Sequence, residues 1–364
     1  MSVVLHIMGM KSSKFGGIER FNIELARQLH ANKHRTVFVY EEVPQSSAYV
    51  EELENSGGKI FVIPSSNPFL FCFKIARLIC EEKATVVHLH FTPARFWAAF
   101  VVVMLRIKKR YMTLHSMVGS ESDFKFLTRI WYRWASRLIP IFTVSKCLES
   151  VAKKNWPMAD VRTMYLGVDR ISGNRKELRQ KLGLREDDFV FLVIANFNRV
   201  KGLDILADAV MMIQDFLRTR KAKVLIVGQE RADFLEFTEW SKKTETFDLF
   251  DQRGIQNNVP EFIALADVYL QPSRTEGLPL SLMEASSCSL PIIATRVGGI
   301  PEIAQEKVNA LLIESEDSES LAQAMKLLVE DEALRNQLSR GNERAYPNFD
   351  VYKCVDKYIQ QYEL

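Results

Sequence analysis

A chain of 364 residues is longer than the ~250–300 residues that one hydrophobic core usually organises, so we expect two domains. Its composition, 47% hydrophobic and 26% charged, is that of an ordinary globular protein. The net charge of +3 is too small to indicate a nucleic-acid partner. The longest apolar run, Phe96 to Leu105, is shorter than the ~20 residues of a spanning helix, so we expect a buried helix with a basic end there.

The cysteines and the first residues indicate a cytoplasmic protein. The five cysteines are odd in number and form no Cys-x-x-Cys pair, which is typical of reduced, buried thiols. The chain enters the strand-like run Val3–Ile7 without a charged region or cleavage site, so we expect no signal peptide.

Apolar runs alternate with helix-length segments along the whole chain. In order, the predicted strands are Val3–Ile7, Thr36–Tyr40, Ile60–Ile63, Val86–His90, Tyr111–Leu114, Ile141–Val144, Phe189–Ile194, Val224–Val227, Val268–Leu270 and Ile292–Ala294. Continuous apolar runs favour parallel strands that are covered on both faces. The segments between them show helical spacing, as in Ile18, Phe21, Leu25 and Leu29. Alternating strands and helices predict doubly wound α/β layers.

A domain boundary is expected near Gly167, where small polar residues cluster before a second series of strands and helices begins. We predict an N-terminal domain of residues 1–168 and a C-terminal domain of residues 169–345. Residues 350–364 form a further helical segment beyond the second domain.

The segment from Arg274 to Glu284 carries the strongest chemical signal. Glu276 follows the strand-like run Val268–Leu270, and Pro279 suits the first turn of a helix that carries Glu284. Carboxylates beside a helix N-terminus can bind sugar hydroxyls while the helix amides face an anion. A ligand with both a polyol and a phosphate would use both.

This segment resembles the Glu-x7-Glu signature of the retaining glycosyltransferases of family four, which have the GT-B fold. Five further segments match that family in the same order: Gly16-Gly17-Ile18-Glu19, Leu114-His115, Leu166-Gly167-Val168-Asp169, Val200-Lys201-Gly202 and Val297-Gly298-Gly299-Ile300-Pro301-Glu302. The resemblance implies two Rossmann-like doubly wound domains facing a central cleft. It also implies that the last helix, within residues 350–364, packs back on the first domain.

The resemblance assigns donor-binding roles to the signature segment. Glu284 would bind the ribose hydroxyls of the nucleotide, and Glu276 would bind the transferred sugar as part of the catalytic machinery. The backbone amides of Leu278 and Leu280 would hold the sugar and phosphates. Pro279 has no amide hydrogen, so one contact of this kind is lost.

Cations and glycines follow other strands. Lys201 and Arg199 could neutralise a diphosphate leaving group, although a solvated basic loop is the plain alternative. The family's commoner arginine is Asn196 here, and Arg199 could replace it. The Gly16-Gly17 pair would let a backbone approach a donor phosphate or form an ordinary loop. Gly228 is a further donor-binding candidate by resemblance.

Histidines and the absence of Asp-x-Asp bear on metal chemistry. The resemblance places His115 near the donor sugar as a catalytic residue. His88 and His90 share one face of a strand and could ligate a metal, but the sequence suggests no third ligand, so we favour core or cleft-lining roles. Because Asp-x-Asp occurs nowhere in the chain, we expect metal-independent transfer and no cofactor beyond the nucleotide-sugar substrate.

Aromatic and basic residues interleave over residues 124–141, including Lys125, Arg129, Trp131, Arg133 and Trp134. Such a helix could rest on anionic lipid or grip a lipid-linked acceptor. It could equally pack its aromatic side chains on the sheet while its arginines face water. Binding of RNA would need a nucleic-acid fold signature, which is lacking.

The resulting expectation is a retaining glycosyltransferase that uses a nucleotide-sugar, with UDP-sugars favoured. The acceptor would be a glycan or a polyprenyl-diphosphate-linked glycan of bacterial surface polysaccharide assembly. The protein would work in the cytoplasm, with peripheral contact to the inner face of an anionic membrane. Two alternatives remain: a GT-B nucleotide-sugar epimerase, and a catalytically silent nucleotide-sugar-binding scaffold.

Overall fold

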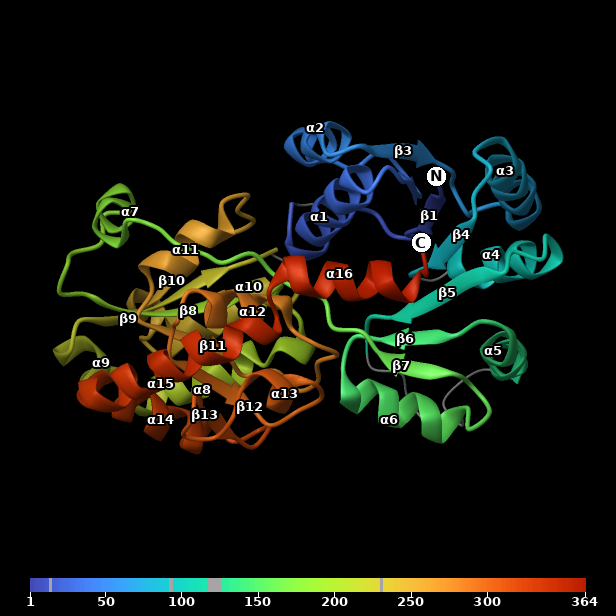
Figure 1. Cartoon of the computed structure of the whole chain (residues 1–364). Helices are drawn as coiled ribbons and strands as arrows, with labels where there is room; N and C mark the ends of the chain where they lie inside the picture. Colours follow the sequence, from blue (N-terminus) through green and yellow to red (C-terminus); the bar gives the residue numbers. More distant parts are fainter. Residues whose placement is uncertain (13–14, 92–93, 117–125, 230–231) are drawn as a thin grey trace. The chain divides into compact units, whose positions relative to one another are not determined.

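The structure, a computed structural model, describes residues 1–12, 15–91, 94–116, 126–229 and 232–364. The chain forms two compact units (Figure 1). The first comprises Met1–Gly167 together with Val351–Leu364, and the second comprises Val168–Asp350. The last helix therefore belongs to the first unit, although the whole second unit separates it from that unit in the sequence.

The first unit is built on a parallel sheet of seven strands in the order β3-β2-β1-β4-β5-β6-β7. The strands are β1 (Val3–Ile7), β2 (Arg35–Tyr40), β3 (Gly58–Val62), β4 (Val86–Leu89), β5 (Lys109–Leu114), β6 (Ile141–Thr143) and β7 (Val161–Thr163). The central strand β1 pairs with β2 and β4, and His6 lies opposite His88 in this register. All five residues of β1 are buried, as its continuous apolar run predicts.

In the described ranges of the first unit, helices flank this sheet. They are α1 (Gly17–Ala31), α2 (Ser47–Asn55), α3 (Pro68–Glu81), α4 (Ala94–Met104), α5 (Phe126–Leu138), α6 (Lys146–Asn155) and α16 (Val351–Gln361). Local signals fix their starts: Asn67 accepts a hydrogen bond from the amide of Leu70 (3.1 Å), and Pro68 occupies the first turn of α3. Helix α16 packs against α1, with Val355 and Tyr358 buried (Figure 1).

The second unit contains a parallel sheet of six strands in the order β10-β9-β8-β11-β12-β13. The strands are β8 (Phe189–Ile194), β9 (Ala222–Val227), β10 (Phe250–Gln252), β11 (Val268–Gln271), β12 (Ile292–Thr295) and β13 (Ala310–Ile313). The helices are α7 (Arg175–Lys181), α8 (Leu203–Met212), α9 (Gln214–Thr219), α10 (Ala232–Lys243), α11 (Val259–Leu265), α12 (Leu280–Ser287), α13 (Ile300–Ile303), α14 (Ser318–Glu330) and α15 (Glu332–Ala345). Its core includes the fully buried Phe191, Leu270 and Ile293.

A buried ion pair joins α7 to the start of β11. The Arg179 side chain is 2% exposed, and its guanidinium donates to Asp267 Oδ2 (2.6 Å) and to the carbonyls of Leu265 (3.1 Å) and Asp188 (2.8 Å). Arg175 donates to the other oxygen of Asp267 (2.5 Å). Burial lowers the pKa of Arg179, so the guanidinium depends on Asp267 to offset its lost hydration.

Two parallel sheets flanked by helices confirm the predicted fold class. The predicted burial of the Phe96–Leu105 run is wrong in part, because Phe100 and Met104 of α4 are 40% and 79% exposed. The helix has one buried face, which includes Ala98 and Val102, and one outward face. No helix in the described ranges is long and apolar enough to span a bilayer.

Candidate active site

The loops that leave the second sheet at its carboxyl edge contact one another through backbone atoms. A β-carbon on Gly228, just after β9, would lie 1.9 Å from the carbonyl oxygen of Ala195, which follows β8. A β-carbon on Gly202, beyond β8, would lie 2.0 Å from the carbonyl oxygen of Pro272, which follows β11. No side chain fits in either place, so only glycine permits these approaches.

Gly298, beyond β12, makes the third contact of this kind. Its φ of +54° is in the left-handed region, and a β-carbon there would lie 1.8 Å from the carbonyl oxygen of Glu276. The loops after four adjacent strands, β9, β8, β11 and β12, are therefore held edge to edge. Ligands of doubly wound sheets bind at this edge, so it is the natural place for a site.

The Glu276 carboxylate is the centre of a hydrogen-bond cluster at this edge. Its Oε1 accepts from Lys201 Nζ (2.6 Å), Gln271 Nε2 (2.9 Å) and Ser273 Oγ (2.8 Å). Its side chain is only 10% exposed, so the ammonium of Lys201 compensates a largely desolvated charge. Within the described residues, Oε2 has no hydrogen-bond partner and is available to a ligand.

Hydrogen bonds at the end of β11 hold the residues that contact this carboxylate. The Tyr269 hydroxyl lies 2.8 Å from Gln271 Oε1 and 2.8 Å from Ser281 Oγ on α12. Thr295 at the end of β12 donates to the Ser273 carbonyl (2.6 Å). Burial raises the pKa of Tyr269 well above its usual range, so the phenol keeps its proton and remains a donor. These bonds fix the orientation of the Gln271 amide toward Glu276.

Arg274 fastens the same loop to the start of α8. Its guanidinium donates to both oxygens of Asp204 (2.7 and 2.8 Å), to Glu316 Oε2 (2.8 Å) and to the carbonyl of Arg199 (2.6 Å). Hydrogen bonds from Arg274 lower the pKa of Asp204 and those to the carboxylates raise the pKa of Arg274. A planar fork of this kind is rigid, so it joins the loop that carries Glu276 to the turn that carries Lys201.

The loop after β8 carries Lys201 and Arg199, the two cations that the sequence analysis proposed for the diphosphate. Lys201 closes a short 3₁₀ turn, Arg199–Lys201, and the Asn198 side chain caps this turn by accepting a hydrogen bond from the Lys201 amide (3.2 Å). Arg199 is exposed. Asn196, at the position of the family's commoner arginine, accepts a hydrogen bond from the Gln229 amide (3.1 Å). Asn196 thus joins the β8 and β9 loops instead of supplying a charge.

The signature helix α12 begins directly after the Glu276 loop. Pro279 is its N-cap residue, and Glu284 is the fifth residue of the helix and is 9% exposed. Leu278 is buried, and Leu280, the first residue of the helix, is half-buried. Sequence reasoning placed Pro279 inside the first turn, one position later than its actual place.

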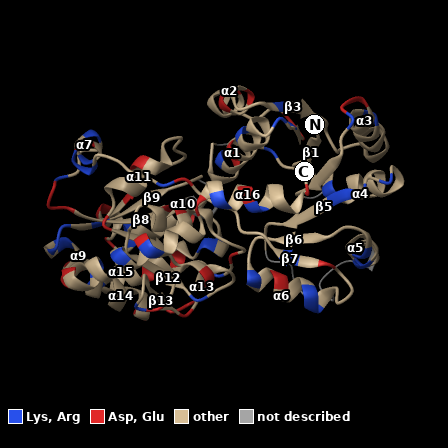
Figure 2. Ribbon diagram, viewed as in Figure 1, with Lys and Arg blue, Asp and Glu red and all other residues tan. Residues whose placement is uncertain are grey.

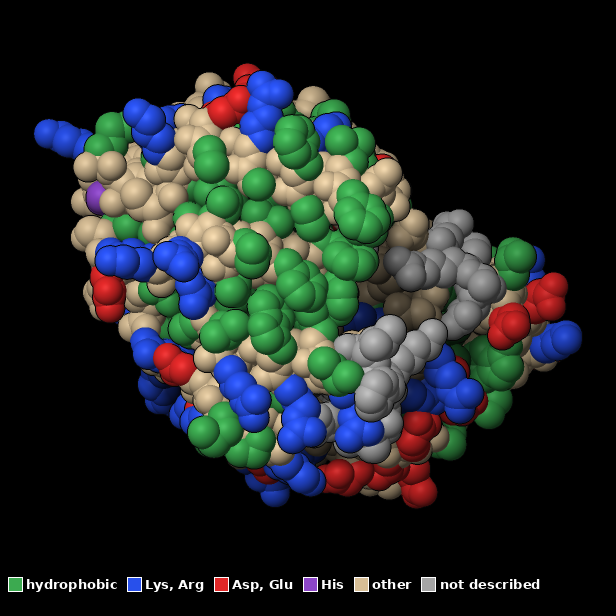
Figure 3. All heavy atoms as spheres, turned by 90° about the vertical axis from the view of Figure 1, so that its right-hand side faces the viewer, with side chains coloured by type: hydrophobic (Ala, Val, Ile, Leu, Met, Phe, Trp, Pro, Cys, Tyr) green, Lys and Arg blue, Asp and Glu red, His purple; other side chains and the backbone are tan. Residues whose placement is uncertain are grey.

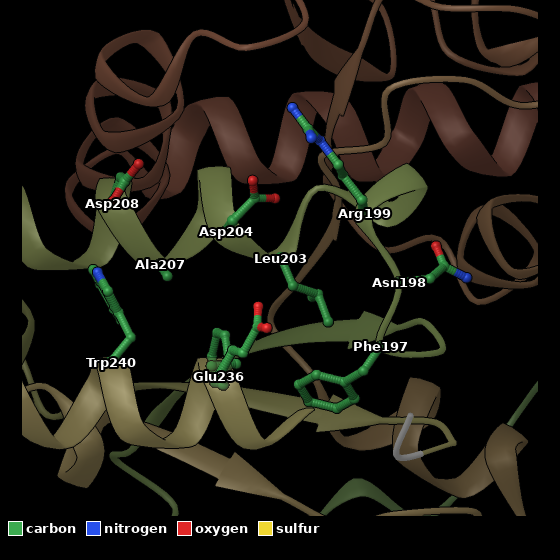
Figure 4. Close-up of a pocket in the computed structure, with 10 residues that line it drawn as sticks. Phe197, Asn198, Arg199, Leu203, Asp204, Ala207, Asp208, Glu236 and Trp240 are labelled. Atoms are coloured by element: carbon green, nitrogen blue, oxygen red, sulfur yellow. The ribbon is translucent and has the colours of Figure 1, made fainter. Parts of the chain in front are cut away.

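A hollow of about 480 Å³ lies beside this edge, between α8 and α10 (Figure 4). Leu203 and Ala207 of α8 face Glu236 and Trp240 of α10, and Phe197 closes one end (Figure 4). The hollow is lined by Phe197, Asn198, Arg199, Leu203, Asp204, Ala207, Asp208, Glu236, Phe237 and Trp240. Three of these are carboxylates, which disfavours a diphosphate there. Burial raises the pKa of Asp208, with a smaller contribution from Asp204.

In the first unit, four histidines form a buried cluster at the carboxyl ends of β1, β4 and β5. His90 Nδ1 lies 3.1 Å from His115 Nε2, and His90 Nε2 lies 3.1 Å from His6 Nδ1. His88 is held separately, by the Tyr362 hydroxyl (2.6 Å) and Thr113 Oγ1 (2.7 Å). The sequence analysis named His88 and His90 but no third candidate ligand, and the structure shows that His6 is such a residue. Ligand atoms of His6, His88 and His90 lie within 4.8 Å of one another.

Burial keeps these imidazoles neutral. It lowers the pKa of His6 and of His115 to about 3 and lowers those of His88 and His90 well below the usual value. A neutral imidazole has one donor and one acceptor nitrogen, so the tautomer of His90 sets those of both neighbours. His115 Nδ1 is buried and has no partner in the described parts of the chain.

The glycine pair after β1 forms the start of α1. Gly16 is the N-cap residue, and its amide donates to Glu19 Oε2 (3.1 Å). The other oxygen of Glu19 accepts from Ser12 Oγ (2.8 Å). The carboxylate of Glu19 thus caps its own helix, a role that the residue pattern alone did not assign. Gly17 is the first residue of the helix.

Helix α5 packs its aromatic side chains on α4. Trp131 is buried and stacks on Phe96 (ring centroids 4.7 Å apart), and Trp134 stacks on Phe100 (4.6 Å). Arg133 is exposed and Arg129 is half-buried. Trp131 and Trp134 therefore pack within the unit, as the second of the two sequence-based alternatives predicted. Lys125 lies outside the described residues.

Comparison with known proteins defines the class. Residues 15–170 match the family model described as Glycosyltransferase Family 4, and residues 174–345 match the one described as Glycosyl transferases group 1. Since these two matches together span nearly the whole chain, the protein belongs to the family 4 glycosyltransferases of GT-B fold. It is therefore a transferase.

Individual relatives support this class. The chain is 27% identical over 362 residues to N-acetyl-alpha-D-glucosaminyl L-malate synthase of Bacillus anthracis, covering 94% of this chain and 92% of that protein. It is 25% identical to UDP-Gal:alpha-D-GlcNAc-diphosphoundecaprenol alpha-1,3-galactosyltransferase of Escherichia coli, covering 77% and 76%. The fold matches Anabaena HepE in complex with UDP-glucose, with a TM-score of 0.86 at 18% identity over the full length of both chains.

Proposed function

We propose that this transferase moves a sugar from a nucleotide-sugar, with UDP favoured, to a hydroxyl of a glycan or lipid-linked glycan, with retention of anomeric configuration. The observation that carries the proposal is the Lys201–Glu276 pair at the carboxyl edge of the second sheet. The relatives support it: the name of the Escherichia coli protein specifies a UDP-sugar and a diphosphoundecaprenol-linked acceptor. The pathway would be the assembly of bacterial surface polysaccharide.

Lys201 and Glu276 would bind different parts of the donor: Lys201 the diphosphate and Glu276 the sugar. The ammonium of Lys201 has three hydrogens and donates one to Glu276 Oε1, which leaves donors for a diphosphate oxygen. The second oxygen of Glu276 would accept hydrogen bonds from hydroxyls of the transferred sugar. The exposed Arg199 would add charge at the diphosphate, so that neutralisation needs no metal.

The remaining donor contacts would come from the same edge. Glu284 would accept from the ribose hydroxyls, and the amides of Leu278 and Leu280 would face the sugar and phosphates at the N-terminus of α12. Gly228 would admit the nucleotide close to the backbone. In the first unit, Gly16 and Gly17 would lie on the phosphate or acceptor side. His115, kept neutral by burial, would donate or accept at a sugar hydroxyl through Nδ1.

In the proposed reaction the bond from the anomeric carbon to the diphosphate breaks as the acceptor oxygen bonds to the same face of the sugar. The acceptor proton passes to the departing diphosphate, whose negative charge Lys201 and Arg199 stabilise. No side chain serves as a covalent nucleophile. Most of the rate enhancement would come from positioning and from charge stabilisation.

The test is a thermal-shift screen of nucleotide-sugars, in EDTA, on the wild-type chain and three variants. A donor at ~100 times its dissociation constant adds about 2.7 kcal/mol of stability. Lys201→Met and Glu284→Gln should lose the shift. Lys223→Met, which removes an exposed lysine from β9, is the matched control and should keep it.

Turnover separates the remaining functions. Transfer of the sugar to added glycan acceptors, with the anomeric configuration of the product read by NMR, would support the proposal. Interconversion of the donor without acceptor would instead show an epimerase, and binding without turnover would show a scaffold. A chain that no nucleotide-sugar stabilises would refute all three.

A further inference from the structure

A large apolar surface covers the outer side of α3 and α4 in the first unit. On α3, Phe69 and Phe73 are 89% and 64% exposed, and on α4, Phe100 and Met104 are 40% and 79% exposed. Each pair is four residues apart, so each forms a ridge along its helix. Figure 3 shows hydrophobic side chains gathered over this face. Contiguous exposed apolar patches often mark interaction sites.

Helices α3 and α4, which carry this surface, and α5 beside them contact one another in series. Helix α3 contacts α4, and Cys72 Sγ lies 3.8 Å from the Trp97 carbonyl across that contact. Helix α4 contacts α5 through the stacked Phe100 and Trp134. The helices that carry these outward side chains bury their other faces, for example through Phe71 and Ile75 of α3.

The margin of the surface is basic along α4, the α4–β5 turn and α5, whereas α3 ends in the exposed Glu81. Exposed cations on α3, on the α4–β5 turn and on α5 are Lys74, Arg106, Lys108, Arg133 and Arg137. Figure 2 shows Lys and Arg in blue on α5. The chain has no Asp or Glu from residue 83 to 115 or from residue 124 to 148. Figure 3 shows Lys and Arg side chains along the lower margin of the apolar area.

We propose that this α3–α4 surface, with its basic margin from the α4–β5 turn and α5, binds the headgroup region of an anionic lipid bilayer. The phenylalanines and Met104 enter the boundary between headgroups and acyl chains, and the lysines and arginines contact lipid phosphates. Charge complementarity favours this occupant over a second copy of the chain, because the same basic margin would face itself in a symmetric dimer. The inference stands on the surface alone and does not depend on the transfer reaction.

This assignment also changes which residues meet the lipid. The aromatic side chains of α5 are occupied by packing on α4, so α5 contributes its arginines and not its tryptophans. The apolar contact comes from α3 and α4, whose alternating exposure only the three-dimensional arrangement reveals.

The experiment is flotation of the full-length protein with vesicles of phosphatidylcholine, alone and mixed equally with phosphatidylglycerol. The wild type should float with the mixed vesicles and at least tenfold less with phosphatidylcholine alone. The double variant Phe69→Ser/Phe73→Ser should lower the partition coefficient at least tenfold. The double variant Met158→Ser/Tyr352→Ser replaces exposed apolar residues elsewhere in the same unit and should bind as the wild type does.

Folding and nucleotide binding are measured on every variant, and both should be unchanged because Phe69 and Phe73 are mostly exposed. This keeps a failure of lipid binding distinct from a failure of the proposed transferase site. Equal binding of the Phe69→Ser/Phe73→Ser variant and the wild type would overturn the inference. So would an absence of wild-type binding to mixed vesicles, or a concentration-dependent dimer that the same two substitutions abolish.

Discussion

Replacing Gly298 by alanine tests the idea that backbone contacts set the geometry of the donor edge. The residue has φ of +54°, where a side chain costs ~1–2 kcal/mol. The new β-carbon would lie 1.8 Å from the Glu276 carbonyl oxygen, and the loop must retreat by 1.2 Å to restore a contact of 3.0 Å. A shift of that size should disturb the 2.6 Å hydrogen bond between Lys201 and the Glu276 carboxylate.

Gly183 offers a matched control, because its φ is +72° but no atom lies within 4 Å of the added β-carbon. Gly183→Ala should therefore cost only the conformational strain, about 1 kcal/mol, whereas Gly298→Ala should cost about 3 kcal/mol. For a unit of this size, each kcal/mol lowers Tm by ~2–4 °C.

The assay combines thermal unfolding with calorimetric titration of the nucleotide. We expect Gly298→Ala to lower Tm by ~6–12 °C and to weaken nucleotide binding at least tenfold. The Gly183→Ala variant should lose ~2–4 °C and bind as the wild type does. Equal losses of Tm in the two variants would refute the proposed role of the Gly298–Glu276 contact.

Two further predictions concern buried ionisable side chains. Burial lowers the pKa of His6 to about 3, so between pH 6.5 and pH 3 the imidazole binds a proton in the unfolded chain but not in the folded chain. The free energy of unfolding should therefore fall by up to about 1.4 kcal/mol per pH unit as the pH drops from 6.5 toward 3. Urea unfolding at pH 7 and pH 5.5 should show a shallower pH dependence for His6→Phe, and an unchanged dependence would contradict the assignment. Asp267→Asn should destabilise the second unit by about 3 kcal/mol, since it leaves Arg179 buried without its counter-ion. Asp187→Asn, which removes an exposed pair with Lys221, should leave the stability nearly unchanged, and equal effects of the two substitutions would contradict the burial argument.

The sequence allowed the fold class and most strands to be predicted because central parallel strands are long and apolar. Phe189–Ile194 and Val3–Ile7 have the predicted bounds. The edge strands Val161–Thr163, Phe250–Gln252 and Ala310–Ile313 were missed. The first two have three residues each and are only partly buried. An edge strand needs few apolar residues, so its pattern resembles a loop.

Only part of the candidate site could be predicted from the sequence. The resemblance singled out Lys201 and Glu276, but their mutual hydrogen bond joins residues 75 positions apart and follows from the loop arrangement. His6 was missed for a similar reason, because its proximity to His90 depends on the order of strands in the sheet. The outward face of α4 was missed because an unbroken apolar run does not reveal which side is covered.

The return of α16 to the first unit has a consequence for synthesis. When the ribosome has completed residues 1–167, the helix that buries Tyr358 and holds His88 through Tyr362 has not been made. At ~5–20 residues per second, its arrival is delayed by roughly ten to forty seconds. During that time the second unit can fold while the first still exposes the groove that α16 will fill. The nascent chain is thus most exposed to chaperones and proteases at its oldest end, and the first unit is completed last.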